Sequence, residues 1–191
     1  MIIGDRSVFA IESKILKAFD RPSFRALGQF NIHLGGHCYG GDKLDASMLA
    51  CSFVEIKRRL DARGTHRAPF SAEPNAGKLA DAFRDAIYAP GQENRLFFGL
   101  PHTEFCNILY SKTIIWAPDG DAAFDDGSYV LQFDVSDQVR LIAFKTRSEG
   151  YHHDPATITD TYMSADKFYQ VLHRWQEAFE LEWEGSCKSS E

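Results

Sequence analysis

The sequence predicts an α+β fold, with a mostly antiparallel sheet, two short helices and a long amphipathic C-terminal helix packed on the sheet. Apolar and polar residues alternate near the N-terminus and again over residues 129–145, which is the period of strands. Around residues 53–88 and after residue 164, apolar residues instead recur every three or four positions, as on helices. No repeat or linker is visible, so we expect a single domain over residues 1–191, an ordinary domain length.

The first elements are predicted to be strands joined by a tight turn. Residues 7–17 place apolar side chains on both faces of a strand, so this strand should be covered on both sides for part of its length. Residues 24–34 follow with Phe30, Ile32 and Leu34 in step on one face. Gly35 and Gly36 follow directly and supply the positive φ values of a two-residue hairpin loop. The return strand should therefore begin at Cys38.

Two short helices are expected next. Ser52 and Glu55 have the spacing of a capping box, which predicts a helix that starts at Phe53. Cations crowd the last turns of this helix, and Gly64 should end it as a left-handed cap. The second helix is predicted over residues 78–88, where apolar side chains share one face.

The remaining elements are predicted to be strands and one long helix. Residues 108–116 are apolar enough for a strand, and residues 129–135 and 139–145 form a hairpin around a short polar turn. A last strand over residues 157–163 leads to Ser164, which should cap the helix. The apolar stripe of this helix consists of Phe168, Leu172, Trp175, Phe179 and Trp183.

The net charge of −6 gathers in the C-terminal part of the chain. Residues 1–76 sum to +3, whereas residues 77–191 sum to −9. Because phosphate contacts need clustered Lys and Arg, this distribution argues against a nucleic-acid-binding protein. It favours a basic protein partner, which a negative surface attracts over a distance. General solubility is the alternative explanation.

Acidic residues concentrate in two places. Residues 117–140 contain six Asp and one Arg, and the end of the last helix carries four Glu without a cation among them. Carboxylates at a helix C-terminus oppose the helix dipole and slightly destabilise the helix. No local interaction in the sequence compensates for this cost, which indicates that these residues serve a function elsewhere. Turn chemistry and a plain solvated face are the simpler explanations. We predict that the partner-binding residues are Asp119, Asp121, Asp125, Asp126, Glu177, Glu180 and Glu184.

No metal or cofactor site is predicted. His33 and His37 flank the Gly-Gly turn, and strand alternation points them to opposite sides of the hairpin, with His33 beside Cys38. An EF-hand loop counted from Asp119 fails, because its fifth position is Ala123. No C-x-x-C pair is present either.

The sequence also lacks the common catalytic motifs, and we expect the protein not to be an enzyme. The adjacent residues His152, His153 and Asp154 lie in a polar loop, where Asp before Pro is a typical turn starter. A small hydrolase or modification-reversing enzyme that uses His152, His153 and a nearby Asp is one alternative. A non-enzymatic ligand-sensing domain is another.

A cytoplasmic location is expected. The chain runs from Met1 straight into a predicted strand, without the basic start and apolar stretch of a secretion signal. No apolar run has the roughly 18 residues of a membrane span. The cysteines share no close spacing, and reduced thiols are the simplest reading for Cys38, Cys51, Cys106 and Cys187.

Three segments resemble the immunity protein 42 family of bacterial polymorphic toxin systems. They are residues 1–13, residues 116–134 with 140–145, and the closing helix with its aromatic stripe. The resemblance implies a cytoplasmic antitoxin that binds and blocks a cognate toxin domain. Its signatures are aromatic and turn residues, so it brings no catalytic residue with it.

Overall fold

A computed structural model describes residues 1–41, 47–118, 121–146 and 152–188. Within these ranges the strands pair in antiparallel sheets, and four α-helices join them, so the α+β prediction is confirmed. The described elements, in chain order, are β1 (Ile2–Asp5), β2 (Phe9–Ala18), β3 (Ala26–Leu34), β4 (His37–Tyr39), β5 (Ser47–Met48), α1 (Leu49–Asp61), α2 (Ala76–Tyr88), β6 (Leu96–Phe97), β7 (Leu100–Pro101), α3 (His102–Ser111), β8 (Ile115–Ala117), the 3-10 helix η1 (Ala122–Phe124), β9 (Ser128–Val135), β10 (Gln138–Lys145), β11 (Thr159–Ser164) and α4 (Ala165–Lys188).

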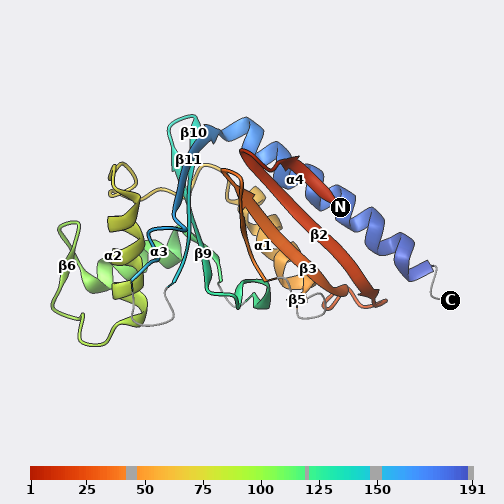
Figure 1. Cartoon of the computed structure of the whole chain (residues 1–191), viewed down its shortest axis with the longest axis horizontal. Coiled ribbons are helices and arrows are strands. Elements are labelled where there is room, and N and C mark those ends of the chain that lie inside the picture. Colours follow the sequence, from red (N-terminus) through yellow and green to blue (C-terminus); the bar gives the residue numbers. More distant parts are fainter. Residues whose placement is uncertain (42–46, 119–120, 147–151, 189–191) are drawn as a thin grey trace.

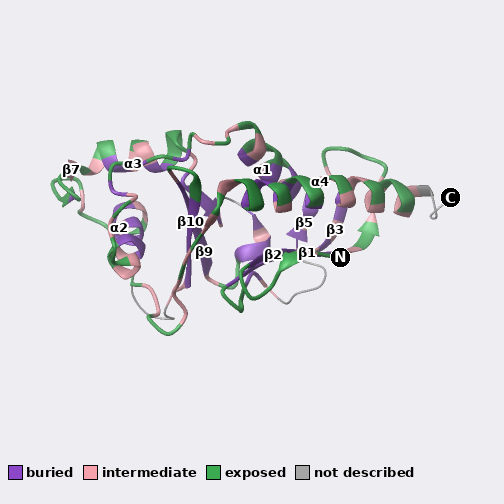
Figure 2. Cartoon of the chain, turned by 90° about the horizontal axis from the view of Figure 1, so that it is seen from above, coloured by how far each residue is buried: buried purple, intermediate pink, exposed green. Residues whose placement is uncertain are grey.

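The sheet with strand order β11-β10-β9-β8 stands in the middle of the molecule (Figure 1). Helices α2 and α3 cover one of its faces, and the other face meets α1, α4 and the N-terminal sheet. Successive side chains of a strand point to opposite faces, so β10 sends Ile142 and Phe144 into one apolar cluster and Leu141 and Ala143 into the other. Burial on both faces explains why β9 and β10 are purple along most of their length in Figure 2.

The N-terminal sheet has the order β1-β2-β3-β4, with β5 also paired to β3. Its hairpin is as predicted: Leu34 pairs with His37 and His33 with Cys38, while Gly35 and Gly36 have φ values of +56° and +84°. Helix α4 packs on β2 and α1 along its predicted apolar stripe (Figure 1). The β9–β10 hairpin and the second short helix are likewise confirmed.

Two predicted elements are wrong. Helix α1 begins at Leu49 and not at Phe53, because Ser52 is no cap: its buried hydroxyl donates to the Oδ2 atom of Asp121, at 2.5 Å. Residues 102–111 form helix α3, where a strand was predicted from residue 108 onward. Phe105 and Leu109 lie one helical turn apart and bury the same face of α3, which the apolar run at residues 108–110 had concealed.

A buried polar network joins the helices to the central sheet. The guanidinium of Arg59, on α1, donates to the carbonyl oxygen of Ile115 at 2.7 Å and to Oε1 of Gln132 at 2.9 Å. Gln132 in turn donates to the hydroxyl of Tyr169 on α4, at 3.0 Å, and that hydroxyl donates to Asp134 at 3.1 Å. Because these groups are hydrogen-bonded, the network fixes how α1 and α4 sit on β9.

Candidate partner-binding surface

The structure separates the acidic residues that the sequence grouped around η1. Asp119 lies outside the described residues. Asp121 is buried, with 8% of its surface exposed, and accepts hydrogen bonds from the hydroxyl of Ser52 and the backbone amide of Ala123. Its buried carboxylate therefore links η1 to α1, and little of it is exposed on the molecular surface.

The other two acidic residues of this turn differ from each other. Asp125 is exposed. Asp126 accepts hydrogen bonds from the amide and hydroxyl of Ser128, and its Oδ2 atom lies 2.6 Å from the ammonium of Lys145. The charge of Asp126 is thus compensated within the fold, whereas Asp125 faces solvent.

The acidic end of α4 is open to solvent. The side chains of Glu177 and Glu180 are 64% and 45% exposed, and Glu184 is exposed as well. Leu181 is 72% exposed, the highest value among the large apolar residues that the structure describes. Residues four and three positions apart share a helix face, so Leu181 lies between Glu177 and Glu184. Leu181 was not predicted as a contact residue, because its place off the buried stripe depends on how α4 docks.

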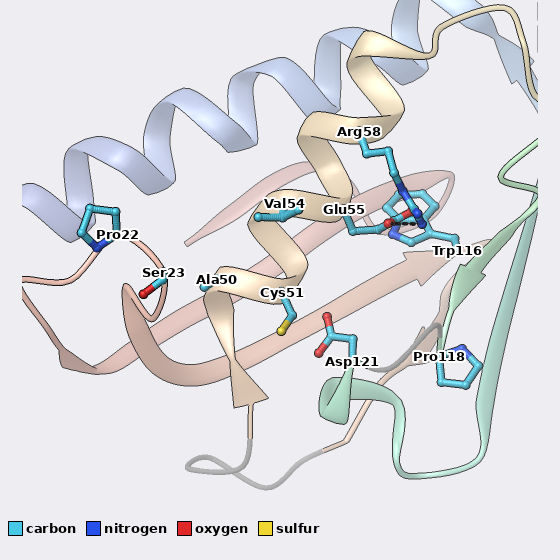
Figure 3. A pocket seen from close by; sticks show the side chains of 10 residues that line it. All are labelled: Pro22, Ser23, Ala50, Cys51, Val54, Glu55, Arg58, Trp116, Pro118 and Asp121. Atoms are coloured by element: carbon cyan, nitrogen blue, oxygen red, sulfur yellow. Dashed lines mark ion pairs between the residues drawn. The ribbon is translucent and has the colours of Figure 1, made fainter.

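A pocket with a volume of about 340 Å³ opens beside α1 (Figure 3). Side chains from α1 form its floor, the turn between β2 and β3 forms one wall, and Trp116, Pro118 and Asp121 form the other. The lining residues are Pro22, Ser23, Ala50, Cys51, Val54, Glu55, Arg58, Trp116, Pro118 and Asp121. No sequence pattern indicates this pocket, since its lining comes from three separate segments.

The pocket lies between the two acidic regions. The indole of Trp183 on α4 donates to the carbonyl oxygen of Phe19 at 3.0 Å, and Glu180 lies 3.6 Å from Arg25. These contacts hold the acidic end of α4 to the β2–β3 turn, which forms one wall of the pocket. Asp121 forms part of the other wall, four residues before the exposed Asp125.

The charges in the pocket are unevenly compensated. Glu55 lies 2.5 Å from Arg58 and 2.8 Å from Arg59, so its carboxylate has cationic partners. Asp121 is different, because a hydroxyl and an amide donate to its carboxylate, and burial raises the pKa of this carboxyl. Burial, with the charge of Asp121, also raises the pKa of the Cys51 thiol, which disfavours a reactive thiolate there.

The histidines of the polar loop are held by a carboxylate that the sequence did not identify. Asp81, on α2, lies 2.7 Å from Nδ1 of His153 and 3.5 Å from Nδ1 of His152. Asp154 instead accepts a hydrogen bond from the amide of Ala156, as a turn starter does. The His153 ring also lies so close to Gly77 that an added Cβ would be 3.1 Å from it, so the ring packs against the start of α2. This arrangement ties the loop to the helix.

The other histidine candidates are apart, as predicted. Nε2 of His33 hydrogen-bonds to Glu12 at 2.8 Å, whereas His37 contacts Thr159 at 3.0 Å. Over the described residues, no group of three or more His, Cys, Asp or Glu side chains comes together in a way that would hold a metal ion. In the same part of the chain, no helix is both long enough and apolar enough for a membrane crossing.

Comparison with known protein families shows which family this chain belongs to. The family model described as immunity protein 42 matches residues 1–178. The chain belongs to the immunity protein 42 family. Family membership gives a toxin-immunity role as the general function of this protein.

A comparison with solved structures finds another protein with a similar fold. A similar solved structure is that of CdiI from Burkholderia dolosa AUO158, with a TM-score of 0.58 and 15% sequence identity. The match covers 93% of this chain and 99% of that chain, so the two proteins share the fold over nearly their whole length. Comparison with curated protein sequences finds no match.

Proposed function

We propose that this immunity protein 42 family member neutralises a cognate toxin by direct stoichiometric binding, in the cytoplasm and without catalysis. Its contact surface would be the acidic region that runs from the end of α4, across the pocket beside α1, to Asp125. A basic toxin domain would be the partner, because opposite charges steer association.

The exposed end of α4 is the observation that supports this proposal most. Leu181 presents an apolar side chain between the carboxylates of Glu177 and Glu184. Protein interfaces are built in this way, with apolar anchors at the centre and charged residues at the rim. Glu180 contributes a further, half-exposed carboxylate beside this face.

Charge reversal at the end of α4 should slow association with the toxin. We expect the double variant Glu177→Lys with Glu184→Lys to lower the association rate constant about 10-fold at low salt, because the surface would then repel a basic toxin. The fold should hold, since cations near a helix C-terminus complement its dipole. Stopped-flow mixing with the toxin domain encoded beside this gene, at several salt concentrations, measures the effect.

A matched control reverses two exposed carboxylates elsewhere. Glu93 and Glu104 are exposed on the α2–β6 connection and on α3, at the other end of the molecule from the C-terminal half of α4 (Figure 1). Changing both to Lys alters the net charge by the same amount. Equal slowing in the two double variants would mean that total charge acts and that the end of α4 is not the contact.

A further inference from the structure

The pocket beside α1 has the size and shape to take one long side chain. Its volume of about 340 Å³ compares with roughly 30 Å³ for a water molecule in the liquid. Pro22 and Pro118 supply apolar surface on its walls and Val54 on its floor, and the carboxylate of Asp121 faces Cys51 (Figure 3). A side chain with an apolar stem and a polar head would match this arrangement.

The charged side chains of the pocket indicate which polar group at the end of an incoming side chain would fit. Arg58 and Arg59 already compensate Glu55, as the dashed line in Figure 3 marks for Arg58. Asp121 is 8% exposed, and among the described residues no Lys, Arg or His lies within ion-pair distance, 4.0 Å, of its carboxylate. A buried carboxylate that has only neutral donors is costly, and an incoming cation would offset that cost.

We propose that this pocket receives a lysine or arginine side chain of the toxin, whose stem packs on Val54 and Pro118 and whose cationic head pairs with Asp121. The inference rests on the proposed function and specifies which kind of toxin side chain the pocket would bind. An apolar side chain in the same place would remove water from Asp121 without replacing its interactions. The exposed Asp125, four residues after Asp121, adds negative charge near this end of the pocket and favours a cation there.

Substitutions of Val54 test whether the toxin side chain in the pocket is positively charged. Val54 is 62% exposed on the outer side of α1, so polar replacements there should not disturb the fold. All polar replacements of Val54 remove its apolar contact, so Val54→Gln, of similar size, is the neutral reference. We expect Val54→Lys to raise the dissociation rate of the complex about 10-fold above that of Val54→Gln, because it adds a competing cation to the lining of the pocket. Val54→Glu should dissociate no faster than Val54→Gln. Charges outside the contact act mainly on the association rate, so the dissociation rate is the readout.

Asp121→Asn is the complementary variant. It keeps the volume of the side chain and an acceptor for the amide of Ala123, while it removes the charge. Loss of one partner of a buried ion pair weakens binding by about 30-fold or more, so we expect the Kd for the toxin domain to rise by at least that factor. Isothermal titration calorimetry with the toxin domain encoded beside this gene measures it.

The outcomes separate the two proposals. Equal weakening by Val54→Lys and Val54→Glu would indicate an apolar occupant and overturn the inference, as would wild-type dissociation rates in both. If Asp121→Asn does not fold, the two Val54 variants still decide. If the wild-type protein does not bind the toxin domain at all, the proposed function fails and the inference fails with it.

Discussion

Replacing Arg59 by Met is expected to lower the free energy of unfolding by about 3–5 kcal/mol, the usual cost of breaking a buried charge network. Arg59 is completely buried, and its guanidinium donates to Gln132 and to the carbonyl oxygens of Thr113 and Ile115. Met fills a similar volume but leaves all three acceptors without this donor. Burial lowers the pKa of Arg59 to about 10, so the group is still charged at neutral pH.

Thermal unfolding of Arg59→Met and of Arg58→Met provides the measurement and its control. Arg58 is the preceding residue on α1, pairs with the same Glu55, and has a side chain that is 47% exposed. Exposed ion pairs contribute about 0–1 kcal/mol, so Arg58→Met should shift the Tm by no more than a few degrees. Arg59→Met should lower it by roughly 10 °C. Similar Tm values for the two variants would show that the buried network does not hold α1 on the sheet.

Trp175→Ala should have an effect of the same size, about 3–5 kcal/mol, because it removes a fully buried aromatic side chain. The ring centroid of Trp175 lies 5.3 Å from that of Phe30 and 5.1 Å from that of Phe179. Its indole also donates to the hydroxyl of Ser13 at 3.0 Å. One side chain therefore joins α4 to β2 and β3.

Denaturant unfolding compares this variant with Trp183→Ala. Trp183 lies two turns further along α4, is partly buried, and donates to Phe19. We expect Trp183→Ala to cost less, because water already reaches the site and the cavity is smaller. A loss of under about 1 kcal/mol for Trp175→Ala would contradict the role of this ring as the centre of the α4 contact.

Local patterns in the sequence predicted the elements in which one residue pattern dominates. The Gly35–Gly36 turn allowed a single register, which placed His33 opposite Cys38 as observed. The stripe of α4 was readable because apolar residues keep the helical period over several turns.

The wrong predictions share a physical cause. Ser52 and Glu55 fit a capping box in sequence, yet both make tertiary contacts, Ser52 with Asp121 and Glu55 with Arg59. The apolar residues near Ile108 fit a strand by composition, but packing of Phe105 under the central sheet favours a helix. Tertiary contacts of this kind override local preference and cannot be seen in one sequence.

The candidate surface was predictable only in part. Acidic composition identified Glu177, Glu180 and Glu184, which the structure places in solvent to differing degrees. Burial of Asp121 and exposure of Leu181 depend on how η1 and α4 dock, so the sequence pattern could not distinguish them.

Titration of toxin activity with this immunity protein tests the central claim, neutralisation by stoichiometric binding. A fixed amount of the toxin domain encoded beside this gene is mixed with increasing amounts of the protein, and the remaining toxin activity is measured. Binding predicts a linear fall that ends at one immunity protein per toxin. Complete neutralisation at a ratio well below one would contradict the account, because only a catalyst can act on many toxin molecules in turn.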